Sequence, residues 1–344
     1  MQKIGHMMKN NPYISVIITA YNRKEFLLDA FNSALNQTSD RSKYEIIVTK
    51  NFRDSKIDSY IKKNDGKLVF FDKPGIGPRI ADALKYAKGE VICFLEDDDL
   101  FMKEKLENIY NIFLKNKNLI YINNARIYIN EKGRNLSRNI SKGAKREKNI
   151  IINDFNKKPV NLLRIQQHDD PWGSSSSIAI RSSLLKRFRS ALYCVNFAPD
   201  VFYYLISLIS GDLLISNKVL TKVMIHESTS NKMGDYESYI KNVLKFGTKD
   251  IANIILSKAK VKVSKQIQKY FDIFSKDQEI NYLFYAGNYR KKVLLDYLQI
   301  FPYIIRAFPK YMIIKNLRVA LYIFAPERYR KLNYEITKKY FGNL

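Results

Sequence analysis

The chain has 344 residues, 46% of them hydrophobic, and it carries a formal net charge of +26. This length and apolar content exclude a disordered polypeptide and suffice for one large domain with an appendage. The positive charge predicts an anionic partner, which could be a nucleic acid, a membrane surface or a phosphorylated substrate.

The first 115 residues alternate between strand-like and helix-like patterns. Residues 13–19 form a β-branched apolar run, which is typical of a strand buried on both faces. We predict that the following elements are helix 23–38, strand 44–49, helix 54–63, strand 67–71, helix 78–88 ended by Gly89, strand 90–95 and helix 103–115. This alternation indicates an α/β fold with a doubly wound, mostly parallel sheet. Ligands bind such sheets beyond the carboxyl ends of the strands.

The pattern changes after Leu119. We expect short strands at 119–123, 126–130, 176–181 and 218–225, and a mobile polar loop at 131–148. From about residue 234 the chain is typical of helices, and residues 241–344 hold 21 Lys and Arg against 7 Asp and Glu. The sequence thus predicts a catalytic-type domain at 1–233 and a basic helical region at 234–344.

The two cysteines have no spacing that would indicate a disulfide framework or a zinc site, and they fit a reducing compartment. No uncharged apolar stretch approaches the ~18 residues of a membrane-spanning helix. The first eleven residues lack the apolar core of a signal peptide. We therefore expect a cytoplasmic protein.

Four consecutive carboxylates follow the apolar strand at 91–95: Glu96, Asp97, Asp98 and Asp99. Adjacent like charges at the end of a buried strand need a counter-charge. A divalent cation with hard oxygen ligands, Mg²⁺ or Mn²⁺, would supply it and could hold phosphate oxygens in turn. The alternative is a solvated acidic turn. Residues 19–23, after the first strand, fall at the same edge of the predicted sheet, so both segments should border one crevice.

Two segments carry a family resemblance. Residues 19–23 read Thr-Ala-Tyr-Asn-Arg, and residues 87–99 read Ala-Lys-Gly-Glu-Val-Ile-Cys-Phe-Leu-Glu-Asp-Asp-Asp. In this order, with Ser33 and Gln37 in the intervening helix, they resemble family 2 glycosyltransferases of the GT-A fold. The resemblance extends over about residues 13–230.

The resemblance implies an inverting, metal-dependent transfer of a sugar from a nucleotide-diphosphate donor to an acceptor hydroxyl. It assigns the metal, Mn²⁺ or Mg²⁺, to Glu96, Asp98 and Asp99, and His226 is a further candidate ligand. It assigns donor binding to Thr19, Ala20, Tyr21, Asn22, Arg23, Arg79 and Asp97. For Arg79 and His226 an ordinary structural role is the alternative.

The sequence departs from the family after the second strand. Family members usually place an Asp there, which contacts the nucleotide base, whereas this chain has Lys50 and Asn51. Asn51 could still hydrogen-bond a base, and Arg53 and Asp54 are nearby substitutes. The identity of the nucleotide is therefore open.

Inverting members also use a carboxylate from the second half of the domain to take the acceptor proton. Asp200 follows a Pro at the start of an apolar helical stretch and is our candidate for this base. The alternative is a first-turn Asp favoured by the helix dipole. Asp169 and Asp170, beside Pro171, are weaker candidates.

Residues 293–324 mix aromatic, apolar and basic side chains at helical spacing. This pattern predicts helices at an anionic membrane surface, on the inner face of the cell membrane, which would suit a glycan or lipid-linked acceptor. The alternative is a helical region packed on the catalytic core. We also consider a non-catalytic GT-A relative and a basic nucleic-acid-binding protein, but no nucleic-acid motif occurs, so nucleic acid is not expected.

Overall fold

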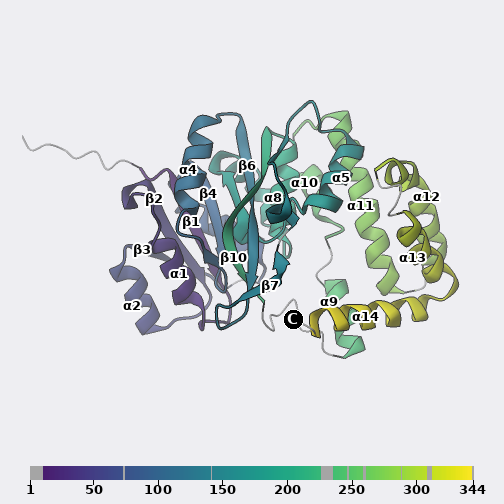
Figure 1. Cartoon of the computed structure of the whole chain (residues 1–344), viewed down its shortest axis with the longest axis horizontal. Coiled ribbons are helices and arrows are strands. Elements are labelled where there is room, and N and C mark those ends of the chain that lie inside the picture. The colour runs from purple at the N-terminus through teal and green to yellow at the C-terminus, as the bar shows by residue number, and fades with distance from the viewer. Residues whose placement is uncertain are drawn as a thin grey trace, which may run out of the picture.

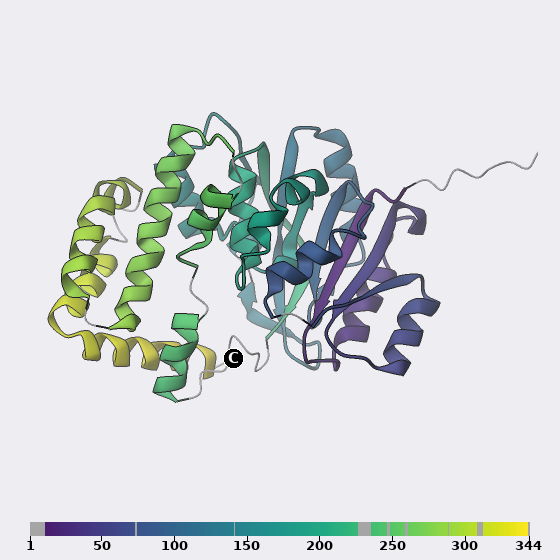
Figure 2. The same ribbon diagram turned by 180° about the vertical axis from the view of Figure 1, so that it is seen from behind.

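A computed structural model describes residues 11–72, 74–140, 142–225, 235–245, 248–258, 261–287, 289–307 and 312–342. Figure 1 shows a twisted sheet with helices on both faces, and a group of helices at the end opposite β3. Figure 2 shows the same arrangement from behind.

The strands are β1 Ile14–Ala20, β2 Tyr44–Lys50, β3 Gly66–Phe70, β4 Val91–Glu96, β5 Leu100–Phe101, β6 Leu119–Ile129, β7 Asn135–Ile140, β8 Ile150–Ile152, β9 Ile178–Arg181 and β10 Asp212–Met224. The main path through the sheet runs β3-β2-β1-β4-β9-β6-β10-β5. Strands β3, β2, β1 and β4 are mutually parallel, and β6 is parallel to β10. Strand β9 is antiparallel to both of its neighbours. The predicted α/β fold with a mostly parallel sheet is confirmed.

The helices of the first 225 residues are α1 Leu27–Leu35, α2 Ser55–Lys63, α3 Ile76–Ala83, α4 Lys105–Lys115, α5 Pro159–Asp169, α6 Ser182–Arg187, α7 Arg189–Leu192 and α8 Pro199–Leu208. Helices α1, α2 and α4 cover one face of the sheet, and α3 and α5–α8 the other. Alternate strand residues serve the two cores: Ile17 points to one and Ile18 to the other. This period of two explains why β1 is apolar throughout.

The described part of the C-terminal region is helical: α9 Tyr236–Lys245, α10 Ile251–Lys258, α11 Lys265–Ala286, α12 Arg290–Ala307, α13 Met312–Phe324 and α14 Pro326–Gly342. Buried side chains of this region join the same core as α5–α8. Arg164 of α5 donates through Nη2 to the Arg306 carbonyl at 2.8 Å, and the ring of Trp172 lies 6.1 Å from that of Phe274. The helical region thus packs on the catalytic part. The expected boundary at 233/234 falls outside the described residues.

Three expectations were wrong in detail. Helix α3 ends at Ala83, and Gly89 does not cap it. A Cβ at Gly89 would lie 2.5 Å from the Ser15 backbone nitrogen, so this glycine instead permits the close approach of β4 to β1. Strand β6 is continuous where two short strands were expected. The polar segment 131–148 contains β7, because pairing with β6, a tertiary contact, outweighs its polar composition.

Candidate active site

The acidic segment lies where β4 leaves the sheet. Strand β4 ends at Glu96, and Thr19 at the end of β1 is its register partner. Asp97, Asp98 and Asp99 are buried in the turn that follows, while Glu96 is exposed. One carboxylate oxygen from each of Glu96, Asp98 and Asp99 lies within 4.8 Å of the others.

This donor set fits a hard divalent cation. Cation–oxygen distances of about 2.0–2.6 Å place ligand oxygens on opposite sides of an ion roughly 4–5 Å apart, which matches the separation in the triad. Three carboxylates are also the ligand type that Mg²⁺ and Mn²⁺ prefer. Glu96, Asp98 and Asp99 could therefore hold such an ion.

Arg23 provides a second counter-charge. Its guanidinium forms ion pairs with Asp97 and, at 2.7 Å, with Asp98. The Arg23 loop and the acidic turn come from different strands of the sheet, so this contact holds the two predicted site segments together. Arg23 thus contacts Asp98, one of the predicted metal ligands.

Serine side chains position Asp99. Ser174 Oγ donates to it at 3.2 Å, and the Met224 amide of β10 donates at 2.9 Å. Ser176 Oγ accepts the Glu96 amide at 2.9 Å, and Ser176 also hydrogen-bonds Asp99. The contact of the serine segment 174–177 with the acidic turn depends on the fold, because the two segments are about 75 residues apart in the chain.

A buried lysine, Lys105, hydrogen-bonds the serine segment. Lys105 Nζ donates to the Ser176 carbonyl at 2.5 Å, to Thr221 Oγ1 at 2.9 Å and to Asn124 Oδ1 at 3.0 Å. Sequence reasoning missed Lys105. A signal was available, because Lys105 lies four residues before Ile109 and so falls on the apolar stripe of its helix.

Burial and mutual repulsion raise the pKa values of these carboxyl groups. Desolvation raises the pKa of Asp97 to about 6 despite the opposing effect of Arg23. Desolvation and the charge of Asp98 raise the pKa of Asp99 to about 7. The pKa of Glu96 is raised as well, although this residue is exposed. Desolvation by the surrounding protein is the largest cause, and the negative charges of Asp99 and Asp98 add to it. A bound cation would oppose all three shifts.

Two asparagines, Asn22 and Asn51, fix the loop after β1. Asn22 has φ 54°, a left-handed conformation that Asn tolerates. The backbone amide of Asn22 donates to Asn51 Oδ1 at 2.8 Å, and the side-chain Nδ2 of Asn51 donates to Asn22 Oδ1 at 2.6 Å. Ala20 pairs with Lys50 in the sheet, so the loop after β1 and the loop after β2 are adjacent. Asn51 therefore lies beside the loop after β1, as the sequence predicts, and it is hydrogen-bonded to Asn22.

Tyr21 and Arg79 form a pair on the same side. Tyr21 is 45% exposed, and the Arg79 guanidinium lies 4.4 Å from its ring centroid. Desolvation lowers the pKa of Arg79, but an arginine remains charged at neutral pH. Its buried Nε has no hydrogen-bond partner among the described residues. The charged Arg79 guanidinium therefore lies behind the exposed ring of Tyr21.

Lys50, at the position where the family usually has an Asp, is engaged within the fold. Its side chain is fully buried, and Nζ contacts Asp58 at 2.6 Å and the Phe52 carbonyl at 2.7 Å. The two nearby substitutes are also engaged elsewhere. Asp54 caps α2 by accepting the Ile57 amide, and Arg53 lies 4.0 Å from the Phe70 ring centroid.

Asp200 lies in the first turn of α8 and accepts the Val201 amide at 3.0 Å. Desolvation, together with the charge of Asp170, raises its pKa to about 6. Asp170 is ion-paired with Arg126, and Asp169 lies 3.6 Å from Arg146. The negative charge of Asp200 also contributes to the raised pKa of Glu96, after desolvation and the charges of Asp99 and Asp98.

Among the described candidates, residues 19–23, 51 and 96–99 lie at or just beyond the carboxyl ends of β1, β2 and β4, Arg79 lies on α3 against Tyr21, and Asp200 lies in the first turn of α8. His226 lies outside the described residues. Carboxylates and an arginine at the carboxyl ends of parallel strands place the chain in the class of α/β proteins that bind ligands at this edge of the sheet.

Comparison with known proteins makes this class more specific. Residues 15–176 match Glycosyl transferase family 2. The chain is 38% identical over 127 residues to an uncharacterized glycosyltransferase of Rickettsia conorii, covering 36% of this chain and 21% of that protein. It is 35% identical over 111 residues to the poly(ribitol-phosphate) beta-glucosyltransferase of Bacillus spizizenii, covering 30% of this chain and 18% of that protein. The chain therefore spans about a fifth of the length of these relatives.

Solved structures show the same fold. S. aureus TarS 1–349 in complex with UDP-GlcNAc superposes with a TM-score of 0.57 at 16% identity, covering 96% of this chain and 91% of that one. The resemblance seen in the sequence is confirmed over residues 15–176, which match the family 2 glycosyltransferases.

Proposed function

We propose that this protein transfers a sugar from a nucleotide-diphosphate donor, a UDP-sugar, to a hydroxyl of a polymeric acceptor, with inversion at the anomeric carbon. The observation that carries the proposal is the meeting of three carboxylates, the Arg23 loop and Asp200 in a family 2 domain. The complex of TarS, a protein of the same fold, with UDP-GlcNAc supports the choice of UDP.

The donor would lie along the loop after β1, with Tyr21 and Asn51 toward the base and Arg79 toward the diphosphate. A cation held by Glu96, Asp98 and Asp99 would neutralise charge on the departing diphosphate as a Lewis acid. Arg23 can exchange its contacts with Asp97 and Asp98 for donor phosphate oxygens, because guanidinium binds both anions in the same bidentate way.

Asp200 would act as the general base. It takes the proton of the acceptor hydroxyl, whose oxygen then bonds to the anomeric carbon on the face opposite the diphosphate. The carbon–oxygen bond to the diphosphate breaks, and its electron pair leaves with that group. A pKa of about 6 lets Asp200 be ionised at neutral pH while remaining a better proton acceptor than an ordinary Asp.

An anionic polyol-phosphate or glycan polymer is the acceptor that we favour. Two relatives are named for poly(ribitol-phosphate), the second being TarP of Staphylococcus aureus, 32% identical over 150 residues, 41% of this chain and 45% of that protein. A net charge of +26 would attract a polyanion.

Thermal unfolding in the presence of UDP-, GDP- and dTDP-sugars, with and without Mn²⁺, tests the donor and the metal. A ligand at about 100 times its Kd adds ~2.7 kcal/mol to the free energy of unfolding, which is a measurable shift. We expect a UDP-sugar to raise Tm only with Mn²⁺, and this shift to vanish in Asp98→Ala.

Asp154→Ala is the matched control, because the Asp154 side chain is 94% exposed and remote from the acidic turn. It should keep the full shift. If no sugar nucleotide raises Tm in the unsubstituted protein, the acidic turn loses its assigned role and the non-catalytic alternative takes its place.

A further inference from the structure

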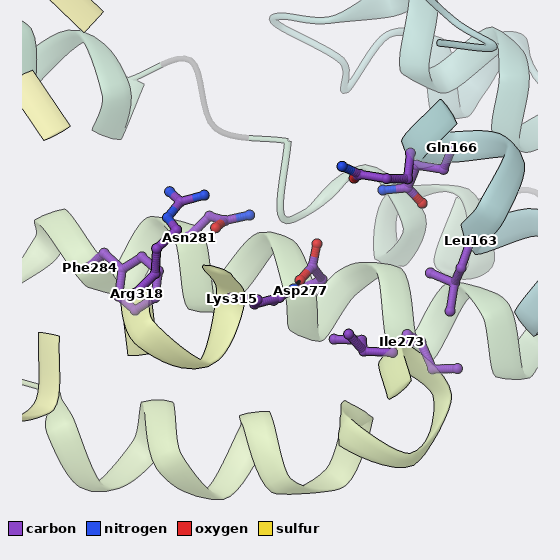
Figure 3. Close-up of a pocket in the computed structure, with 10 residues that line it drawn as sticks. Leu163, Gln166, Ile273, Asp277, Asn281, Phe284, Lys315 and Arg318 are labelled. Atoms are coloured by element: carbon purple, nitrogen blue, oxygen red, sulfur yellow. Dashed lines mark hydrogen bonds and ion pairs between the residues drawn. The ribbon is translucent and has the colours of Figure 1, made fainter. Parts of the chain in front are cut away.

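A second cavity lies away from the acidic turn, where the helical region meets the catalytic part. Its volume is about 180 Å³, and α5, α11, α12 and α13 line it. Figure 3 shows the polar side chains Gln166, Asp277, Asn281, Lys315 and Arg318 around this space. Apolar side chains, among them Leu163 and Phe284, complete the wall.

The cavity wall holds an ion pair and two amide side chains that keep hydrogen-bonding capacity. Asp277 and Lys315 form an ion pair across it. Gln166 Oε1 accepts the Tyr270 hydroxyl at 3.0 Å, which fixes the side chain, but its NH₂ group donates to none of the described residues. The Asn281 amide likewise has no partner in the part of the chain that the structure describes. Both side chains are half-buried, so each retains hydrogen-bonding capacity directed at a small enclosed space.

This chemistry fits a hydroxylated ligand. Amide groups both donate and accept, as hydroxyls require, and a few polar groups on an otherwise apolar wall are typical of small-ligand sites. Asp277 pairs with Lys315, and Arg318, which donates to the Tyr329 hydroxyl at 2.9 Å, gives the wall one net positive charge, which suits a ligand that carries a single phosphate beside its hydroxyls. A cavity of 180 Å³ has room for about six water molecules at ~30 Å³ each, the scale of one sugar or polyol unit.

Helix α5 links this cavity to the active site. Gln166 lies four residues before Asp170, about 6 Å along a helix axis. Asp170 is paired with Arg126 and acts on the pKa of Asp200. Trp172, just after α5, packs on both Tyr204 of α8 and Phe274 of α11. A polymer whose reacting hydroxyl lies at Asp200 could therefore reach the cavity within a few units.

We propose that this cavity binds one hydroxylated unit of the polymeric acceptor, at a distance from the unit that receives the sugar. This inference rests on the proposed function. Binding at a second point would raise affinity for long acceptors over single units, because the second contact forms at high effective concentration.

Binding of poly(ribitol phosphate) and of ribitol phosphate by calorimetry, without donor, tests the inference. We expect Gln166→Ala and Asn281→Ala each to weaken binding of the polymer about three- to tenfold, the effect of one lost hydrogen bond. Transfer to the single unit should keep its kcat and KM. Gln299→Ala, an exposed amide on α12 outside this cavity, is the control and should bind the polymer normally.

Unchanged polymer affinity in both cavity variants, or no polymer binding by the unsubstituted protein, would overturn the inference and leave a water-filled gap between helices. Failure of the proposed function is seen separately, as the absence of a UDP-sugar shift in Tm. Variants are compared only where their unfolding transitions match that of the unsubstituted protein.

Discussion

The pair formed by Asn22 and Asn51 shows how one substitution changes a site. With Lys50 buried against Asp58, the first polar group available after β2 is an amide. That amide makes two hydrogen bonds to Asn22, at 2.8 and 2.6 Å, and so holds the loop after β1 in its left-handed turn. The chain thus stabilises the loop from a position where the family usually contacts the base.

Asn51→Ala should therefore weaken donor binding more than it slows the chemical step. Loss of two hydrogen bonds at ~0.5–1.5 kcal/mol each predicts roughly a tenfold rise in the KM for the donor. Steady-state kinetics with varied donor measure this. Asn64→Ala, a half-buried Asn at the end of α2, is the control. A fall in kcat with an unchanged KM would contradict the prediction.

Asp200 leads to a prediction about pH. A general base works only when it is deprotonated, so kcat/KM should rise with pH up to about 6 and level off above it. Asp200→Asn should lower kcat by roughly 10²–10⁴-fold, the usual contribution of general-base catalysis, and leave donor affinity unchanged. A pH–rate profile measures the first effect and calorimetry with donor the second. A variant with normal kcat would remove Asp200 from the mechanism.

At the scale of elements, the acidic turn depends on a chain of contacts from α4 to β10. Lys105 of α4 donates to the Ser176 carbonyl, and Ser174 donates to Asp99. The backbone amide of Met224 in β10 also donates to Asp99. Each contact joins residues far apart in the sequence. The segments flanking Asp99 therefore form one unit, although none of their sequences alone indicates it.

Lys105→Ala should destabilise the whole domain. Removing this buried side chain deletes three hydrogen bonds and leaves a cavity, and a buried truncation of this kind costs about 2–5 kcal/mol. Urea unfolding should show a lower midpoint with an unchanged slope. Lys115→Ala, an exposed lysine on the same helix, should change the midpoint little. Equal stability of both variants would show that the Lys105 network contributes nothing.

At the scale of the whole molecule, the helical region presents apolar side chains outward. Leu294, Leu298 and Ile305 of α12 are 41%, 56% and 40% exposed, and helical spacing places them on one face. Exposed Lys291 lies near this face. No helix among the described residues has the length and apolar composition needed to cross a bilayer. The predicted contact with an anionic membrane surface agrees with this face and stays a prediction.

Sedimentation with phosphatidylglycerol vesicles tests the predicted contact of α12 with an anionic membrane surface. Burial of one Leu contributes ~1.5–3 kcal/mol, so Leu298→Glu should lower partitioning at least about tenfold, and salt should weaken it further. Leu114→Glu changes a comparably exposed Leu, 43%, on α4 and serves as the control. Vesicle binding that is equal in the two variants would place the membrane contact elsewhere or remove it.

The sequence by itself determined the local elements of the first domain and the residue types of the site. Continuous apolar runs indicated β1, β2 and β4, and helical patterns indicated α1 and α2. The run from Glu96 to Asp99 indicated the need for a counter-charge. All of these signals are local. Only the tertiary structure decided that Arg23 reaches Asp97 and Asp98, that Lys50 turns inward to Asp58, and that α5 connects the second cavity with the active site. Those contacts depend on which strands are neighbours and how helices pack, and no local pattern encodes them.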